Sequence, residues 1–333
     1  MILTVGVRDA GTALGLPAMG LAIGVDVGGT KVAAGLVDDA GAILSTARRP
    51  TPAADADAVL ALVADVVDEL AGATAEPVVG VGVGVAGPVD GQRSTVYFAP
   101  NLQWHQVPAR EVLQKATGLP VVIENDGNAA AWGEFRFGAG QGQRDVVLVT
   151  VGTGIGGGIV LDGSLFRGAH GAGGEIGHIS HVADGVQCGC GRRGCWEQYA
   201  SGNALVRETR MLATARRADA TLLLDLGDRT PEGIQGQHIT EAAMAGDPVA
   251  LQALRDLGVH LGIGLADLAA VLDPDLFIVG GGVSEAGDLL LAPARDTLRA
   301  SIIGGANRPV PQVVPATLGN LAGLVGAADL ARR

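Results

Sequence analysis

Four side chains that can bind a metal lie close together in the sequence: His178, Cys188, Cys190 and Cys195. Their spacing is His-x9-Cys-x-Cys-x4-Cys, and the chain has 3 cysteines in all. Three thiolates and an imidazole suit tetrahedral zinc, and an odd number of clustered cysteines fits a metal site better than a disulfide framework. Four protein ligands leave no open position, so we expect a structural zinc. Three cysteines without a metal are the plainer alternative, and His170 or His181 could replace the histidine.

Carboxylates flank this cluster. Glu175 lies three residues before the histidine, and Glu197 lies two residues after the last cysteine. Bound zinc would therefore hold two acids in place. With Asn125 and Asp126 they form a set of acceptors suited to a polyol, whose hydroxyls need several oriented partners. Each acid taken alone is explained as well by an ordinary surface carboxylate.

Asp126 is the candidate general base. It stands where the apolar strand LPVVIEN ends and the helical pattern NAAAWGEFRFG follows. The positive end of a helix dipole favours an ionised carboxylate, as a base requires. The alternative is a helix cap, and one residue can serve both purposes.

Two glycine-rich segments share one pattern, VDVGGTKVAAGLVD at 25–38 and VTVGTGIGGGIVLD at 149–162. They align without a gap, and each predicts a strand, a turn of small residues and a second strand. We interpret them as a duplicated β-hairpin, one copy opening each of two related domains. Chance similarity between glycine-rich strands is the alternative.

The turns of these hairpins are candidate phosphate sites, because the backbone N–H groups of glycine-rich turns bind phosphates. Asp26 would hold Mg²⁺ through water. Thr30 and Thr153 would hold the terminal phosphates, with a third glycine turn after the strand LFIVG. Each turn alone could be a plain hairpin, but three together favour a nucleotide. The predicted ATP-binding residues are Asp26, Gly28, Gly29, Thr30, Lys31, Gly152, Thr153, Gly154, Gly281 and Gly282.

Two other nucleotide motifs are excluded. The G-x-G-x-x-G runs at 82–87 and 152–157 do not open a helix, and a dinucleotide site needs a helix N-terminus for the pyrophosphate. In Gly28-Gly29-Thr30-Lys31 the order of lysine and threonine is the reverse of a P-loop, and a strand follows.

The composition is that of a folded protein with two domains. The chain has 333 residues, of which 48% are hydrophobic and 17% charged. Its net charge of -12 argues against a nucleic-acid or anionic-membrane partner, and no segment has the length and apolarity of a membrane span. Helices are predicted at 55–70, 111–118, 128–138, 238–272 and 322–333, and further strands at 78–87, 119–126 and 276–282. Strands followed by helices predict an α/β fold.

Five of these motifs together resemble the ROK family (repressors, open reading frames, kinases), and within it the actinobacterial glucokinases. They are DVGGTK at 26–31, END at 124–126, GTGIGGG at 152–158, EIGH at 175–178 and CGCGRRGCWE at 188–197. The resemblance covers about residues 20–333. It implies a two-lobed, actin-like ATPase fold of the hexokinase (RNase H-like) type, with a β-hairpin in each of two duplicated domains. It further implies ATP-dependent phosphorylation of D-glucose at the 6-hydroxyl, giving glucose 6-phosphate and ADP, with Mg²⁺ and structural zinc.

The resemblance also implies roles for individual residues. Asp126 corresponds to the catalytic base, and His178 to both a zinc ligand and a sugar contact. One departure is Gly127, where the glucokinases usually have alanine; we expect it to loosen the helix start slightly. The implied sugar-binding residues are Gly87, Asn101, Asn125, Asp126, Glu175, His178 and Glu197.

The resemblance sets the expected organisation. From the residues themselves, 1–19 would be a poorly ordered extension before the first strong strand pattern, with an extra edge strand as the alternative. Residues 20–136 would form a small lobe and 137–316 a large lobe with the zinc site, and a helix at 317–333 would pack back on the small lobe. Family repressors carry an N-terminal helix-turn-helix, and about 20 residues before the first hairpin are too few for that module. We expect a cytoplasmic homo-oligomer, a dimer or a tetramer, without nucleic-acid or membrane partners.

Four alternatives stay open at this stage. The chain could phosphorylate another hexose or an N-acetylhexosamine, or it could use polyphosphate as the donor. It could instead be a non-catalytic sugar-sensing regulator, which the intact Asn125-Asp126 pair argues against. A metallohydrolase would need an open zinc position with bound water.

Overall fold

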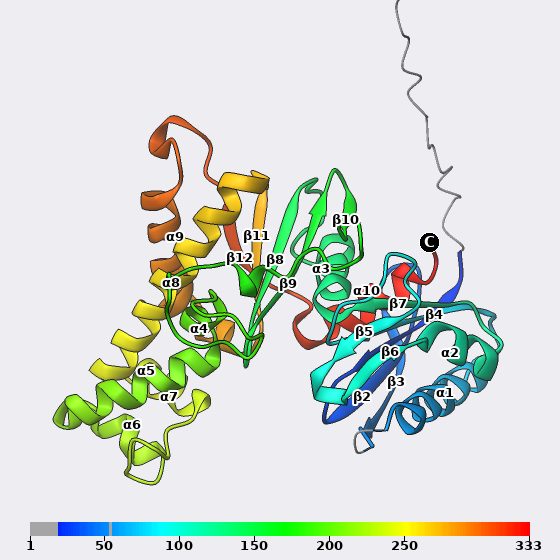
Figure 1. Ribbon diagram of the computed structural model, residues 1–333, viewed down its shortest axis with the longest axis horizontal. Coiled ribbons are helices and arrows are strands. Elements are labelled where there is room, and N and C mark those ends of the chain that lie inside the picture. The colour runs from blue at the N-terminus through cyan, green and yellow to red at the C-terminus, as the bar shows by residue number, and fades with distance from the viewer. Residues whose placement is uncertain (1–18, 53–54) are drawn as a thin grey trace, which may run out of the picture.

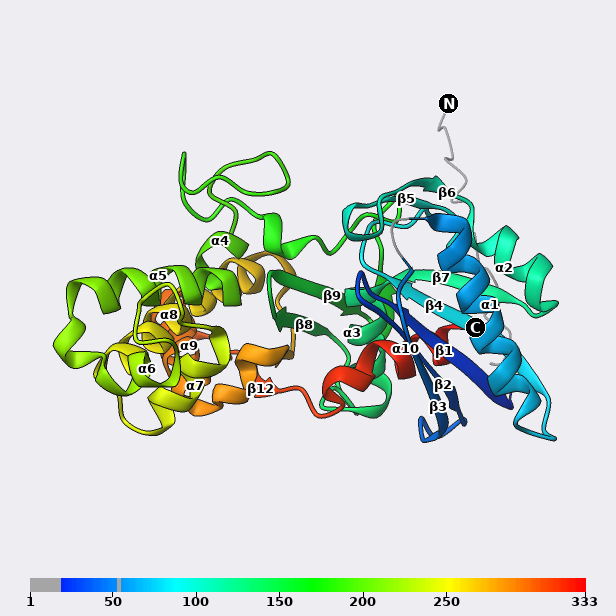
Figure 2. The same cartoon turned by 90° about the horizontal axis from the view of Figure 1, so that it is seen from below.

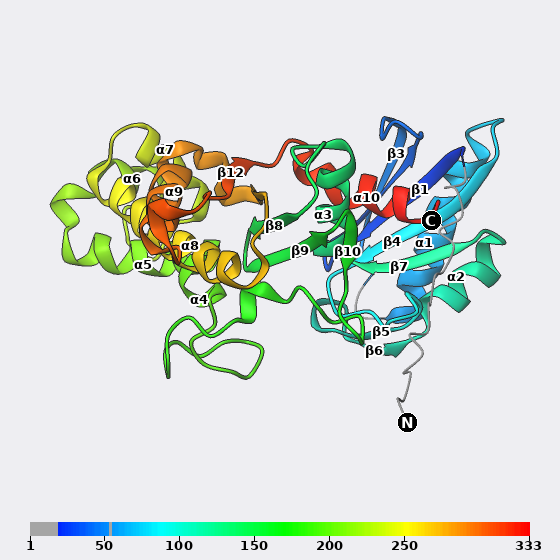
Figure 3. The same cartoon turned by 90° about the horizontal axis from the view of Figure 1, so that it is seen from above.

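The computed structural model describes residues 19–52 and 55–333. Of the predicted N-terminal extension, only the exposed Met19 falls within the described residues. The rest of the chain contains two five-stranded sheets with helices packed around each (Figure 1). Helices α5 to α9 lie together on one side of the second sheet, at one end of the molecule, and α1 and α2 lie at the other end, as two further views also show (Figures 2 and 3).

The two sheets have the same topology. The first has the order β3-β2-β1-β4-β7 and the second β10-β9-β8-β11-β12. In each, the hairpin strands and the edge strand beside them are antiparallel, and the other two strands are parallel. The predicted α/β fold with duplicated, hairpin-containing halves is therefore confirmed. The strands are β1 (Leu21–Val27), β2 (Lys31–Val37), β3 (Ile43–Pro50), β4 (Val78–Val85), β7 (Val121–Asn125), β8 (Val146–Val151), β9 (Ile155–Leu161), β10 (Ser164–Phe166), β11 (Leu276–Gly280) and β12 (Gln312–Pro315).

The two hairpins differ by one residue in register. Val27 pairs with Val32 in the first, whereas Val151 pairs with Ile155 in the second, although the gapless alignment matches Val32 with Gly156. The second turn is therefore one residue tighter. Because side chains alternate faces along a strand, the strand after the turn presents its residues to opposite faces in the two copies. The duplication is preserved in topology but not in the surface that each second strand presents.

The two faces of the first sheet pack against different helices. Its valines at alternate positions, such as Val81 and Val83, are buried beneath α1 (Ala56–Gly72) and α2 (Ala109–Thr117). The glycines between them face α10 (Ala322–Leu330) instead. A Cβ at Gly24 or Gly82 would overlap backbone carbonyls of α10. The Val-Gly alternation of β4 thus follows from a strand that buries side chains on one face and admits a helix backbone on the other.

Helix α3 (Asp126–Phe137) begins where β7 ends and packs against both α10 and β9. The second sheet is covered by α8 (Pro248–Leu272) and its neighbours. These neighbours are α5 (Gly202–Ala215), α6 (Thr221–Leu226), α7 (Gly236–Met244) and α9 (Asp288–Ser301), and the short α4 (Glu197–Ala200) follows the cysteine loop. A small hairpin of β5 (Val96–Ala99) and β6 (Trp104–Val107) lies beside the first sheet.

Glu134 joins the two chain segments that pass between the sheets. Its buried carboxylate accepts hydrogen bonds from the backbone of Ala139 after α3, and from Thr317 and Leu318 before α10, at 2.9, 3.2 and 2.7 Å. A charged carboxylate is buried at low cost only when several donors satisfy it, as here. The lobe boundaries 20–136, 137–316 and 317–333 remain a prediction, with α10 lying against β1, β4 and α3.

None of the helices in the described residues combines the length and apolarity needed to cross a bilayer.

The glycine contacts of α10 predict an unusual response to alanine. Gly326 lies within α10, and a Cβ there would overlap the carbonyl oxygen of Ala129 in α3. Alanine normally stabilises a helix relative to glycine by about 1 kcal/mol. Gly326→Ala should instead lower the free energy of unfolding by about 1–3 kcal/mol, because α3 and α10 must move apart.

The matched control is Gly72→Ala, at the end of α1, where an added Cβ meets no atom within 4 Å. It should leave stability unchanged or raise it by up to about 1 kcal/mol. Equal effects of the two substitutions in urea denaturation would contradict the close packing of α10.

Candidate active site

His178, Cys188, Cys190 and Cys195 bring their donor atoms within 4.8 Å of one another. The Sγ atoms of Cys190 and Cys195 are 3.6 Å apart, and Cys188 Sγ is 3.7 Å from His178 Nδ1. In a tetrahedral site with Zn–S bonds of about 2.3 Å, neighbouring ligand atoms lie about 3.8 Å apart. The four residues therefore fit a structural zinc ion. His178 is the histidine that completes the set.

The cysteine loop folds tightly because of its glycines. Gly191 and Gly194 have φ of 88° and 72°, and a Cβ at Gly194 would overlap the carbonyl oxygen of Val182. Arg192 donates from its side chain to the carbonyl of His178 at 3.0 Å, and its own carbonyl accepts from the N–H of Cys188 at 2.8 Å. The loop before α4 stands out from the body of the lobe (Figure 2), yet its turns hold the ligands together.

The two alternative histidines have other surroundings. His181 Nε2 lies 3.0 Å from Nδ1 of His260 on α8. Desolvation, followed by the charge of His260, lowers the pKa of His181. His170 accepts a hydrogen bond from Tyr97 through its backbone carbonyl. Neither belongs to the group of converging ligand atoms.

Glu197 connects the cysteine loop to the second hairpin. Its Oε2 accepts from the N–H of Ile155 at 3.1 Å, and its Oε1 lies 3.7 Å from Cys188 Sγ. A Cβ at Gly154 would overlap the same carboxylate, so this turn position must be glycine while Glu197 occupies the space. The structure thus places Glu197 against a predicted phosphate turn.

Asn125 and Asp126 occupy the junction of β7 and α3. Asn125 is the N-cap: its side chain accepts from the N–H of Asn128 at 3.0 Å and donates to the carbonyl of Gly87 at 3.3 Å. Asp126 is the first helical residue, so its carboxylate is not needed for capping. Gly87 must lack a Cβ, which would overlap the carbonyl of Phe98. The junction thereby leaves Asp126 free for chemistry.

Three carboxylates lie near this junction, those of Asp26, Asp126 and Glu175. Asp26 pairs with Gly84 in the sheet, and a Cβ at Gly84 would lie 3.7 Å from Cα of Asp126. Desolvation, helped by the charge of Asp126, raises the pKa of Asp26 to about 6. Desolvation also raises the pKa of Glu175, with smaller contributions from Asp126 and Glu197.

Desolvation likewise raises the pKa of Asp126, against hydrogen bonds that include one from the N–H of Gly127. The helix N-terminus favours the ionised form, but desolvation by burial is the larger effect on the pKa of Asp126. A raised pKa makes the ionised carboxylate a stronger proton acceptor.

The first turn lies beside Asn101. A Cβ at Gly29 would sit 3.2 Å from both Cβ and the carbonyl oxygen of Asn101, which belongs to the short helix Pro100–Leu102. Thr51 also braces this turn by donating to the carbonyl of Gly28 at 2.6 Å. The exposed Thr30 and Lys31 complete it. Asn101 is thus placed at the first predicted phosphate turn.

A pocket of about 840 Å³ opens beside the second turn. Of the predicted residues, Gly152, Thr153 and Gly282 line it. Gly281, with φ of 86°, lies directly against Val151 and turns the chain into the pocket wall. Sequence reasoning missed the rest of the wall, which comes from α5, α7 and the helix Gly282–Ala286: Gly202, Asn203, Leu205, Val206, Gly236, Gln237, Thr240, Glu241, Met244, Val283 and Glu285.

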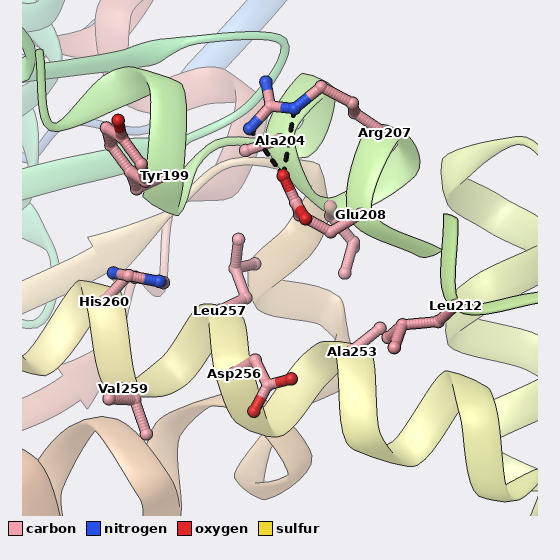
Figure 4. Close-up of a pocket in the computed structure, with 11 residues that line it drawn as sticks. Tyr199, Ala204, Arg207, Glu208, Leu212, Ala253, Asp256, Leu257, Val259 and His260 are labelled. Carbon is pink, nitrogen blue, oxygen red and sulfur yellow. Dashed lines mark hydrogen bonds and ion pairs between the residues drawn. The ribbon is translucent and has the colours of Figure 1, made fainter. Parts of the chain in front are cut away.

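A separate pocket of about 240 Å³ lies between α5 and α8 (Figure 4). Tyr199 and His260 stand at one end, and Arg207 and Glu208 form an ion pair at 2.9 Å across its rim. All its lining residues lie outside the predicted site, and Leu205 also lines the 840 Å³ pocket.

Gly127 has a packing function that the sequence did not suggest. A Cβ at this position would overlap the carbonyl of Gly157 in β9. Glycine therefore lets the first turn of α3 contact the second hairpin backbone directly. The backbone next to Asp126 therefore lies close to β9.

Two sheets of the same topology, each with a glycine-rich hairpin turn, define an actin-like ATPase fold. The chain belongs to the ROK family, which residues 22–333 match. Over 314 residues it is 54% identical to a glucokinase of Streptomyces coelicolor, covering 94% of this chain and 98% of that relative.

Two solved structures share the fold. A ROK family glucokinase from Streptomyces griseus, crystallised with glucose and AMPPNP, is 54% identical with a TM-score of 0.84, covering 94% of this chain and 99% of that one. A ROK hexokinase from Thermus thermophilus is 35% identical with a TM-score of 0.76, covering 93% and 97%.

The zinc cluster predicts which histidine holds the metal. His178→Gln should weaken zinc binding by more than about 100-fold, the upper effect of losing a partner outside the ligand shell. His181→Gln should retain zinc, because that side chain contacts His260 instead. Metal content after dialysis against a graded chelator, read by atomic emission, distinguishes them. Zinc loss in the second variant but not in the first would contradict the assignment.

The raised pKa of Asp26 predicts that the free energy of unfolding depends on pH. The pKa of Asp26 is about 6 in the folded state, compared with an ordinary value of 3.8 that applies to the unfolded chain. The folded state therefore binds this proton more tightly than the unfolded chain does. Stability should therefore fall as pH rises from about 4 to 6 and stay lower above that range. Asp26→Asn should stabilise the ligand-free protein at pH 7 by at most about 3 kcal/mol, and have no such effect below about pH 4.

Thermal or urea unfolding across pH 4–8 measures this difference, with the exposed Asp65→Asn on α1 as control. A destabilised Asp26→Asn protein at pH 7 would show that a partner satisfies the carboxylate there.

Proposed function

We propose that this protein is an ATP-dependent glucokinase, which transfers the γ-phosphoryl group of ATP to the 6-hydroxyl of D-glucose. The observation that carries the proposal is the junction of β7 and α3. There Asp126 is the first residue of α3 but not its N-cap, and it lies beside Gly84, which pairs with Asp26 of the first hairpin. Full-length similarity to glucokinases at 54% identity supports the substrates.

ATP would bind with its adenosine in the 840 Å³ pocket and its phosphates towards the two turns. Val206, Met244 and Val283 offer apolar surface for a base, and Asn203 and Gln237 offer polar contacts. The N–H groups of Gly29, Thr30, Thr153 and Gly154 would hold phosphate oxygens, because those of Gly28 and Gly152 donate within their own turns. Asp26 would hold Mg²⁺ through water, and the ion supplies neutralisation of phosphate charge when bound.

Glucose would bind on the other side of Asp126. Asn125, Glu175, His178 and Glu197 supply acceptors and donors for its hydroxyls, and the loop at Gly87 closes beneath them. Asn101 would contact the sugar from the first turn. Several oriented hydrogen bonds favour one polyol over others, because an unmatched hydroxyl leaves buried polar groups unpaired.

Asp126 would accept the proton of the 6-hydroxyl as that oxygen attacks the γ-phosphorus. The bond to the β–γ bridging oxygen breaks in line, and ADP leaves. The transition state is loose, so positioning and charge neutralisation supply most of the rate. The raised pKa of Asp126 brings it nearer to the working pH, where a general base is effective.

The zinc ion would take no chemical step, since its four protein ligands leave no open position. It would hold His178 on the sugar and Glu197 against Gly154, so one ion braces both sides of the cleft. Its three thiol ligands are those of a reducing compartment, which supports a cytoplasmic location. We also propose a homo-oligomer, a dimer or a tetramer, for which exposed apolar side chains such as Met211, Val271 and Ile303 offer contact surface.

A coupled assay over several sugars and donors tests the function. The panel includes glucose, mannose, N-acetylglucosamine and N-acetylmannosamine with ATP or polyphosphate. Glucose with ATP should give the highest kcat/KM. A different preferred sugar or donor would revise the specificity within the same chemistry. No turnover with any pair, together with measurable sugar binding, would favour a sugar-sensing regulator.

Asp126→Asn tests the base. The amide cannot accept the proton, so kcat should fall by at least about 100-fold, the lower range for a general base. Glucose affinity by calorimetry should change little, and the exposed Asp65→Asn should behave as the parent. Turnover retained within tenfold of the parent would remove Asp126 from this role.

A further inference from the structure

Glu124 is a buried carboxylate that the mechanism does not use. It is 1% exposed and directly precedes Asn125 and Asp126 on β7. The alternation of β7 places it on the same face as Val122, which packs towards the second sheet, and opposite Ile123, which packs beneath α1 and α2. A buried acid at this position needs partners from outside its own sheet.

The two oxygens of Glu124 are held differently: Oε1 accepts hydrogen bonds, whereas Oε2 has two close ion pairs without hydrogen-bond geometry. Oε1 accepts from the N–H of Asn125 at 3.0 Å and from Nδ2 of Asn128 at 3.1 Å. Oε2 lies 3.1 Å from Nε of Arg93 and 2.8 Å from Nε of Arg167. One carboxylate thus holds the start of α3 and two guanidinium groups that come from different parts of the chain.

Arg167 reaches this carboxylate from the other sheet. It directly follows β10, and its side chain is 11% exposed. Its terminal nitrogens donate to the carbonyls of Gly91 and Asp90 at 3.2 and 2.9 Å. The same guanidinium therefore ties an element of the second sheet both to Glu124 and to the loop that follows Gly87.

Arg93 completes the connection from within that loop. It has a φ of 56°, and its carbonyl accepts from the N–H of Ile123 in β7 at 3.1 Å. The segment after Arg167 also packs here, because a Cβ at Gly171 would overlap the carbonyl of Val89. That segment leads within a few residues to Glu175 and His178.

We propose that Glu124, clamped by Arg93 and Arg167, is a positioning residue that sets the sugar side of the cleft. Three segments carry the proposed sugar contacts: the end of β7 with Asn125, the loop after Gly87, and the segment 167–178. Each is bound to this one carboxylate directly or through an arginine. The inference rests on the proposed function, since it assigns these segments to the sugar.

The network predicts a selective effect on the sugar. Arg167→Lys keeps the charge, but an ammonium cannot bridge a carboxylate and two carbonyls in the planar arrangement of a guanidinium. The KM for glucose should rise by about tenfold or more, because small displacements of positioning groups have large effects on productive binding. The KM for ATP should stay within about twofold, since the nucleotide pocket is built from α5, α7 and the helix Gly282–Ala286.

Two further variants complete the experiment. Arg93→Lys, whose side chain is 26% exposed, should show the same but smaller split, and it decides the question if Arg167→Lys does not fold. Arg144→Lys is the matched control, because its exposed pair with Asp162 lies just before β8 and just after β9, at the end of these strands opposite the turn 152–154. It should leave both constants unchanged.

Hydrogen exchange supplies a readout besides activity. Glucose should protect 87–94 and 167–178 in the parent but not in Arg167→Lys, while a nonhydrolysable ATP analogue should protect 236–244 in both. An unchanged KM for glucose would overturn the proposal. Equal losses for glucose and ATP would do the same, because they indicate a general structural role. A parent protein that is inactive with glucose but active with another sugar would change the proposed function alone, and the same split would then be read with that sugar.

Discussion

The structure depends on how closely the first turn of α3 approaches the second sheet. Gly127 contacts Gly157, and the Cα of Asn128 lies 2.9 Å from the position of a Cβ on Gly158. Behind the helix, Gly133 and Gly326 let α10 pack against it backbone to backbone. Because these contacts leave no room for a Cβ, Asp126 is held at the junction of the two sheets rather than at the edge of one.

The zinc site would fix the loop that carries its ligands. The zinc ligands lie on a loop that stands away from the core, and a loop of this kind is mobile unless something fixes it. Four ligands on one ion supply that constraint. Because Glu197 follows the last cysteine and contacts the second turn, zinc ligation would position residues on the proposed nucleotide side as well as on the proposed sugar side. Zinc would therefore support the second turn as well as the sugar contacts that the sequence suggested.

Local patterns predicted the parts of the site that depend on neighbouring residues. The zinc quartet, the hairpin turns and the strand-to-helix junction at Asp126 are each contained in a short segment with its own signature. The nucleotide pocket wall was missed because α5, α7 and the helix Gly282–Ala286 contribute single residues without a shared motif. The clamp on Glu124 was missed for the same reason. Arg93 and Arg167 come from distant parts of the chain, and only the folded structure brings both of them to Glu124. The raised pKa of Asp126 depends on burial, which a helix-start pattern does not reveal.

The central claim is that Asp126 receives the proton of the glucose 6-hydroxyl at the junction of the two sheets. A crystal structure of the zinc-loaded protein with glucose and a nonhydrolysable ATP analogue tests it most directly. The account predicts the 6-oxygen within hydrogen-bond distance of the Asp126 carboxylate and in line with the γ-phosphorus, with the adenosine between α5 and α7. Glucose bound with its 6-hydroxyl turned away from Asp126, or a nucleotide outside that pocket, would contradict it.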